Sequence, residues 1–340
     1  MTWSLKRPIF LAAVAAVALS GCSQVVPPHL KPIPAEAKAL LAQKGMREDS
    51  PIMVRIFKEE AELEIWKAKD DGRFHHFKTY PICNYSGALG PKLKQGDKQS
   101  PEGFYKVSAK QMNPNSSYHL SFNLGYPNPF DKSHKRTGNY LMVHGDCKSA
   151  GCYAMTDALI EEIYAMAREA FTGGQEEFDV HAMPFRMSVE NMRRHSRNKN
   201  YAFWRNDLYQ GYKDFEDTRL PPKIDVCERH YLVNVSFSNG EKPARPDAKC
   251  PIFQRLPLEA LPKAPTYREA SIPNRHARPM SIGQPASTGA ISSAKPMSIG
   301  QPATTAASQA TIGHGSTFGF APKKPSLSGF AFGLNATLSK

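Results

Sequence analysis

Apolar residues recur at every second position in the first structured part of the chain. They do so across residues 52–56 and again across residues 63–65, with a charged turn between the two runs. A two-residue period places alternate side chains on one face of a strand, so the two runs predict a hairpin. Residues 74–83 form a third extended segment, and together these segments predict a β-rich sheet.

A helical period follows in residues 158–171, where apolar residues recur at helical spacing after an acidic first turn. Beyond this helix, the pattern predicts a strand over residues 178–183 and then a helix capped by Ser188. A further helix with a buried aromatic face is predicted over residues 201–215, and a last strand over residues 231–237. Beyond Cys250 no regular pattern continues. The predicted fold class is therefore mainly β with flanking helices (α+β).

Two polar stretches lack such a period. Residues 85–105 are rich in Gly and Pro, which indicates ordered turns between strands. Residues 113–136 are rich in Asn, Pro, Ser and Tyr, and a loop of this length inside a domain is often a lid or a substrate wall. We therefore predict a long loop there.

The first 21 residues have the order of a secretory signal peptide. Basic residues precede an apolar run that is too short to span a bilayer, and Leu19-Ser-Gly-Cys22 follows. This ending resembles the lipobox of bacterial lipoproteins, so Cys22 is the predicted lipidation site. The alternative is an ordinary signal peptide cut nearby. Ser23 favours sorting to the outer membrane, so we expect a periplasmic protein held to the bacterial envelope by lipid.

Low-complexity segments flank the part that is expected to fold. Residues 22–49 begin Pro-rich and predict a tether. Residues 261–340 hold eight basic residues and one acidic residue, a net charge of +7, and repeat Pro-Met-Ser-Ile-Gly-Gln-Pro-Ala. Such a composition buries little apolar surface, which predicts a disordered tail. The tail could bind an anionic wall or lipid surface, or be solvated without a specific partner.

The whole chain of 340 residues carries a formal charge of +13, which suits anionic partners. No aromatic-basic RNA motif or zinc-finger spacing accompanies this charge, so no nucleic-acid partner is predicted. If Cys22 is lipidated, five cysteines remain, and an odd number in an oxidising compartment leaves at least one thiol without an intramolecular partner. Cys152 is the candidate for the free thiol. Cys227 and Cys250, in the segment 221–260, would pair first, and Cys83 with Cys147 is possible.

Candidate chemistry gathers in residues 140–157. A strand-like run ends at His144, and a turn leads to Cys152 just before the helix. A thiol near an imidazole and a helix N-terminus can act as a nucleophile, with the imidazole as base. The main chain at Gly145 could orient the ring, and the amides of Gly151 and Cys152 could hold an oxyanion. The alternatives are a buried structural cysteine and a zinc site, which would use Cys147 and lack a fourth ligand.

His144-Gly145 followed by Ser149-Ala-Gly-Cys152 resembles the signature of the L,D-transpeptidase (YkuD-type) superfamily. The chain also resembles the YafK-like branch of this superfamily in six motifs: Ile56-Phe-Lys-Glu-Glu60, Tyr85-Ser-Gly, Gly90-Pro-Lys, Gln95-Gly-Asp, Ser100-Pro-Glu-Gly-Phe-Tyr and Pro184-Phe-Arg-Met. The resemblance implies an L,D-transpeptidase-type catalytic domain over residues 50–220. It also implies a nucleophile at Cys152, a base at His144, orientation of the base by Gly145, and a nucleophile loop shaped by Ser149 and Gly151.

The implied substrate is a peptidoglycan stem peptide, attacked at the L-centre carbonyl of diaminopimelate. The acyl group of the resulting thioester would pass to an amine or to water. Transfer to an amine would give a cross-link or a protein anchored to peptidoglycan, and transfer to water would give cleavage. No cofactor or metal is implied. The wider superfamily has Arg two residues after the cysteine, whereas this chain has Ala154, a loss that the YafK-like branch shares. The alternative function is a non-catalytic peptidoglycan-binding lipoprotein. A papain-like protease fits less well, because its cysteine lies far ahead of its histidine.

Overall fold

The computed structural model describes residues 25–264. The predicted signal peptide, the lipidation site Cys22 and all of the predicted tail beyond Ala264 lie outside the described residues. No helix within residues 25–264 is long and apolar enough to cross a membrane.

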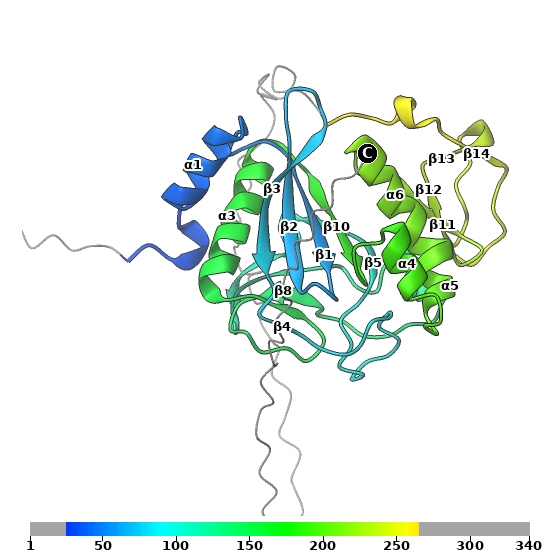
Figure 1. Cartoon of the computed structure of the whole chain (residues 1–340), viewed down its shortest axis with the longest axis horizontal. Helices are drawn as coiled ribbons and strands as arrows, with labels where there is room; N and C mark the ends of the chain where they lie inside the picture. Colours follow the sequence, from blue (N-terminus) through cyan, green and yellow to red (C-terminus); the bar gives the residue numbers. More distant parts are fainter. Residues whose placement is uncertain (1–24, 265–340) are drawn as a thin grey trace, which may run out of the picture. The chain divides into compact units, whose positions relative to one another are not determined.

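One five-stranded sheet has the strand order β3-β2-β1-β10-β5 (Figure 1). Only β1 and β10 pair in parallel, and the other neighbours are antiparallel. The hairpin expected from the alternating pattern is present, with Val54 of β1 opposite Ile65 of β2. The strand bounds are β1 (Ile52–Phe57), β2 (Glu62–Ala68), β3 (Phe74–Pro81), β5 (Gly103–Ser108) and β10 (Glu177–Met183).

A second five-stranded sheet has the order β4-β9-β8-β7-β6. Its strands are short: β4 (Asn84–Tyr85), β6 (Met112–Ser116), β7 (His119–Asn123), β8 (Met142–His144) and β9 (Tyr153–Ala154). Here β8 and β9 pair in parallel, with His144 opposite Ala154. This pairing brings the two ends of the candidate stretch side by side.

Helices cover both faces of the first sheet (Figure 1). On one side the main apolar core joins that sheet to the second sheet and to α3 (Asp157–Thr172). On the other side a second cluster packs against α4 (Val189–Arg194), α5 (Tyr201–Phe203), the π-helical turn η3 (Trp204–Leu208) and α6 (Tyr209–Thr218). Strand β1 is buried along its whole length because it is covered on both faces. The predicted α+β class is confirmed.

Several predicted boundaries are wrong. Residues 113–136 are not one long loop, since β6, β7, and α2 (Pro129–Ser133) account for much of the segment. Asn128 caps α2 in a capping box, a local signal that the composition of the segment obscured. Residues 25–49 also differ from the predicted tether. Residues 25–49 contain η1 (Pro28–Leu30) and α1 (Ala35–Gln43), and Ala37 and Leu41 of α1 are buried in the main core.

The segment after residue 220 contains two short hairpins. The strand predicted over residues 231–237 is split into β12 (His230–Val233) and β13 (Val235–Phe237) by Asn234, whose φ is 54°. Strand β12 pairs with β11 (Ile224–Cys227), and β13 pairs with β14 (Phe253–Arg255), which lies where no regular pattern was expected. The 3-10 turns η2 (Ala109–Gln111), η4 (Ser238–Gly240) and η5 (Leu258–Ala260) complete the described elements.

Candidate active site

The thiol of Cys152 lies against the strand that leads to His144. Its Sγ accepts a hydrogen bond from the Met142 N–H at 3.4 Å and lies 3.6 Å from the carbonyl oxygen of Tyr140. Cys152 is the only free cysteine among the described residues, since Cys83 is bonded to Cys147 and Cys227 to Cys250. The pairing of β8 with β9 thus places this thiol at the start of β8, two residues before His144 along the strand.

The imidazole of His144 is buried and held in one orientation. Its Nδ1 lies 2.6 Å from the carbonyl oxygen of Gly145, which can only accept, so Nδ1 carries the proton and Nε2 has a free lone pair. The ring of Tyr118 packs against the imidazole with 4.9 Å between the centroids. A neutral imidazole with its basic nitrogen at Nε2 has the protonation state that a general base requires.

Glycine is needed at position 145 for steric reasons. A Cβ at this position would lie 2.5 Å from Oδ1 of Asp157 and 3.0 Å from Cβ of His119. The same Asp157 oxygen accepts a hydrogen bond from the Asp146 N–H at 2.8 Å. Close packing of the main chain here brings the Gly145 carbonyl oxygen within hydrogen-bond distance of the imidazole.

Burial acts in opposite directions on the two candidate groups. It raises the pKa of the Cys152 thiol, while the Met142 N–H and the charge of Lys92 oppose this in part. Burial lowers the pKa of His144, opposed by the Gly145 carbonyl and by Asp146. Both shifts favour a neutral thiol beside a neutral imidazole at neutral pH. The site is therefore suited to proton transfer during attack rather than to a preformed thiolate–imidazolium pair.

The loop between His144 and Cys152 has an unusual backbone. Asp146 and Cys147 have positive φ values of 66° and 49°, and Gly151 has a φ of 127°. The disulfide from Cys147 to Cys83 ties the loop to the residue before β4. Because this bond occupies the Cys147 sulfur, the zinc alternative is excluded for the disulfide-bonded chain. No group of three or more His, Cys, Asp or Glu residues within residues 25–264 has a metal-site arrangement.

The structure places Ser149 and Gly151 behind the thiol. Ser149 Oγ donates to the Cys152 carbonyl oxygen at 2.7 Å. The Gly151 N–H, which was expected to face an oxyanion, instead donates to Ser86 Oγ at 2.7 Å. In contrast, the Cys152 N–H makes no hydrogen bond within the described part of the chain, and this amide is the remaining candidate oxyanion donor.

Two further residues at the site, Ser86 and Ser100, were missed by sequence reasoning. Ser100 Oγ donates to the Cys152 carbonyl oxygen at 3.0 Å, so this carbonyl accepts from two serines. The motifs Tyr85-Ser-Gly and Ser100-Pro-Glu were visible in the sequence, but their Gly and Pro content was taken to indicate turns. Ala154, where the superfamily has Arg, is fully buried and pairs with Asn84.

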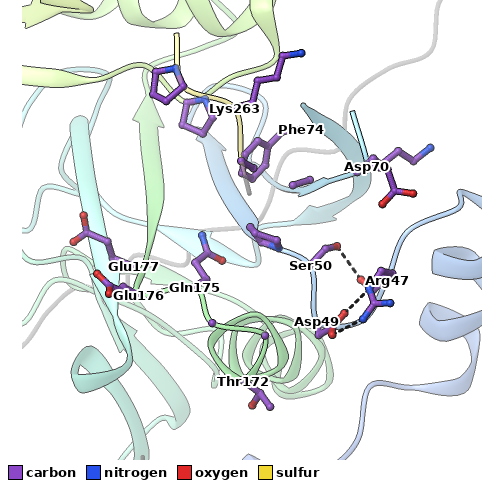
Figure 2. Close-up of a pocket in the computed structure, with 18 of the residues that line it drawn as sticks. Arg47, Asp49, Ser50, Asp70, Phe74, Thr172, Gln175, Glu176, Glu177 and Lys263 are labelled. Carbon is purple, nitrogen blue, oxygen red and sulfur yellow. Dashed lines mark hydrogen bonds and ion pairs between the residues drawn. The ribbon is translucent and has the colours of Figure 1, made fainter. Parts of the chain in front are cut away.

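A large cavity of about 870 Å³ lies away from these residues. It adjoins the C-terminal end of α3, and Figure 2 shows Arg47, Phe74 and Gln175 around it. Cys152 lies close to the N-terminal end of the same helix, which at a rise of 1.5 Å per residue is about 24 Å long. None of the predicted site residues lines the cavity, so it is separate from the candidate active site.

Fold and site together define an α+β domain with a free cysteine against the strand that ends in a buried, oriented histidine. The family model of the L,D-transpeptidase catalytic domain (YkuD) matches residues 55–180. "Putative L,D-transpeptidase YafK" of Escherichia coli strain K12 is 44% identical over 190 residues, which are 56% of this chain and 76% of that protein. The protein of the same name from Escherichia coli O157:H7 matches equally well.

The chain therefore belongs to the L,D-transpeptidase family and to its YafK-like branch. This is a family of cell-envelope enzymes that act on peptidoglycan stem peptides.

Among solved structures, the helical cell shape determining protein Pgp2 of Campylobacter jejuni is 18% identical, with a TM-score of 0.32. The match covers 56% of this chain and 79% of that one. Bd1075 of Bdellovibrio bacteriovorus is 17% identical with a TM-score of 0.30, over 52% and 76% of the two chains. Likeness at this level adds nothing to the family assignment.

Proposed function

We propose that the chain is a cysteine acyltransferase that acts on peptidoglycan stem peptides. The observation that carries the proposal is the placement of the free Cys152 thiol against β8, which ends in the buried and oriented His144. Membership of the L,D-transpeptidase family supports peptidoglycan as the substrate. The acyl donor is the L-centre carbonyl of diaminopimelate in a stem peptide.

The reaction proceeds in two transfers. His144 Nε2 accepts the thiol proton as Sγ attacks the carbonyl carbon, and the Cys152 N–H donates to the oxyanion that forms. The C–N bond then breaks, and His144 returns the proton to the departing amine, which leaves a thioester on Cys152. An incoming amine or water attacks the thioester carbonyl carbon as His144 Nε2 accepts its proton, and the C–S bond then breaks while His144 returns that proton to the sulfur. The acceptor decides between cross-linking or protein anchoring and hydrolytic release.

The proposed function predicts a change in isolated peptidoglycan. Purified sacculi incubated with the protein should yield new cross-linked muropeptides, or shortened and released stem peptides, by liquid chromatography and mass spectrometry. Protein first incubated with a carbapenem, a β-lactam that acylates nucleophilic thiols, is the matched control and should leave the profile unchanged. Binding to sacculi with an unchanged profile would contradict the enzyme and favour a wall-binding lipoprotein.

A lipid anchor at Cys22 is a further part of the proposal and is supported by the sequence of residues 1–22 alone. It would hold the protein to the envelope membrane, the outer membrane being favoured by Ser23. We expect a Cys22→Ala variant to appear in the soluble periplasmic fraction, whereas the unaltered chain is recovered with membranes. Membrane recovery of both would refute this anchor.

A further inference from the structure

Three serine hydroxyls from distant parts of the chain meet behind Cys152. Ser86 and Ser100 come from the segment between β4 and β5, and Ser149 comes from the loop that precedes Cys152. Ser86 is hydrogen-bonded to Gly151, which lies 65 residues further along the chain, and Ser100 is hydrogen-bonded to Cys152, which lies 52 residues further along. This convergence is produced by the tertiary fold and not by the local sequence around the cysteine.

The hydrogen bonds of Ser86, Ser100 and Ser149 form two chains, each with a definite donor and acceptor at every step. In the first, the Gly151 N–H donates to Ser86 Oγ at 2.7 Å, and Ser149 Oγ donates to the Cys152 carbonyl at 2.7 Å. Because the Ser149 proton is used there, the 2.6 Å contact between the two hydroxyls is a bond donated by Ser86. In the second, the Ser86 N–H donates to Ser100 Oγ at 3.2 Å, and Ser100 Oγ donates to the Cys152 carbonyl at 3.0 Å.

The peptide unit that joins Gly151 to Cys152 is held through its two neighbours, because the Gly151 N–H belongs to the unit before it and the Cys152 carbonyl to the unit after it. The Gly151 N–H has an acceptor, and the Cys152 carbonyl has two donors. The φ of 127° at Gly151 belongs to a backbone region that side chains rarely allow, and such a conformation persists when surrounding contacts hold it. The direction of the Cys152 N–H and the position of its Sγ depend on this peptide unit.

The segment that carries Ser86 and Ser100 is itself anchored in the protein interior. Lys58 Nζ, which is fully buried, donates to the carbonyl oxygens of Ala88 at 2.8 Å, Gly90 at 3.1 Å and Ser100 at 3.1 Å. It also pairs with Glu102 at 3.0 Å. The serine hydroxyls therefore approach Cys152 from a segment with a fixed main chain, as positioning of a reacting group requires.

We propose that Ser86 and Ser100 are positioning residues for Cys152. They hold the peptide units on either side of the Gly151–Cys152 peptide, so that the thiol meets the acyl carbon while the Cys152 N–H faces the developing oxyanion. Neither hydroxyl touches the substrate, and neither exchanges a proton in the reaction. The proposal rests on the proposed role of Cys152 as the nucleophile and assigns a function to two residues outside the His144–Cys152 stretch.

The test compares Ser86→Ala and Ser100→Ala with the unaltered full-length chain in carbapenem acylation, followed by intact-mass spectrometry over a range of reagent concentrations. We expect the acylation rate constant at saturation to fall about 10- to 100-fold, because a displacement of about 1 Å at a reacting centre has an effect of this size. The concentration for half-maximal rate should change by less than about twofold, since the reagent still binds. Ser86→Thr, which keeps the hydroxyl, should restore most of the rate.

Ser133→Ala is the matched control. Like Ser100, Ser133 is buried and its hydroxyl donates to a main-chain carbonyl, that of Phe130 at 2.7 Å, within α2. Wild-type rates in both alanine variants would overturn the proposal, as would an equal loss of rate in Ser133→Ala. It would also be overturned if Ser86→Thr lost as much rate as Ser86→Ala while keeping the melting temperature of the wild type. A wild-type chain that forms no adduct at Cys152 would instead refute the proposed function, so the two failures are distinguishable.

Discussion

Replacement of Cys152 by alanine is expected to abolish the covalent adduct that the protein forms with a carbapenem. Cys152 is the only cysteine within residues 25–264 that is not in a disulfide, and its Sγ lies against the strand that ends in the oriented imidazole of His144. Removal of a nucleophile leaves no group to form the thioester, so the loss should be complete rather than partial. Intact-mass spectrometry after incubation measures the adduct directly.

A double Cys227→Ala/Cys250→Ala variant is the control for this experiment. It removes the other described disulfide without creating a new free thiol, and neither sulfur contacts the site. We expect its adduct yield to equal that of the wild type at a temperature where it remains folded. Undiminished adduct on Cys152→Ala would show that another group is acylated and would refute the assigned nucleophile.

The pH dependence of the same adduct follows from the directions of the two pKa shifts. The His144 pKa lies below its usual 6.5, so the imidazole stays neutral and basic until the pH falls to this lowered pKa. The Cys152 pKa is raised, so the thiol keeps its proton through neutral pH. Adduct formation should be nearly constant from about pH 7 to 8 and lost as the pH falls through the lowered His144 pKa. A half-maximal rate well above pH 6.5 would contradict this.

Local sequence predicted those parts of the site that lie close together in the chain. His144 and Cys152 lie on either side of one turn, and the strand before it and the helix after it have clear periods, so both residues could be proposed as site residues without the fold. Ser86 and Ser100 could not be found in this way, because their partners lie more than 50 residues away. A serine in a Gly-rich turn looks the same whether it faces solvent or a catalytic loop.

The errors in the fold have a related cause. Strand β7 has only five residues, and it is stable because β6 and β8 pair with it on both edges, which its own composition does not reveal. Helix α1 follows a Pro-rich stretch that indicated a tether, yet Leu41 is buried in the core that joins the two sheets. In both places tertiary contacts outweighed weak local preference.

The buried pair of Lys58 and Glu102 is expected to contribute strongly to stability. Substitution Lys58→Met should lower the free energy of unfolding by about 3–5 kcal/mol, because it leaves the Glu102 carboxylate without its partner in the interior. Glu102 would retain only the donors Gly90 N–H at 2.6 Å and Trp204 Nε1–H at 2.8 Å. Urea unfolding followed by tryptophan fluorescence would measure the change.

Two further variants separate the charge effect from a general effect of substitution. Glu102→Gln in the Lys58→Met background removes the unpaired charge while keeping an acceptor for Gly90 and Trp204, so we expect the double variant to be more stable than Lys58→Met alone. Lys38→Met breaks the exposed pair with Glu48, and its cost should be about 1 kcal/mol or less. Equal losses in Lys58→Met and Lys38→Met would mean that the interior pair does not anchor the segment that carries Ser86 and Ser100.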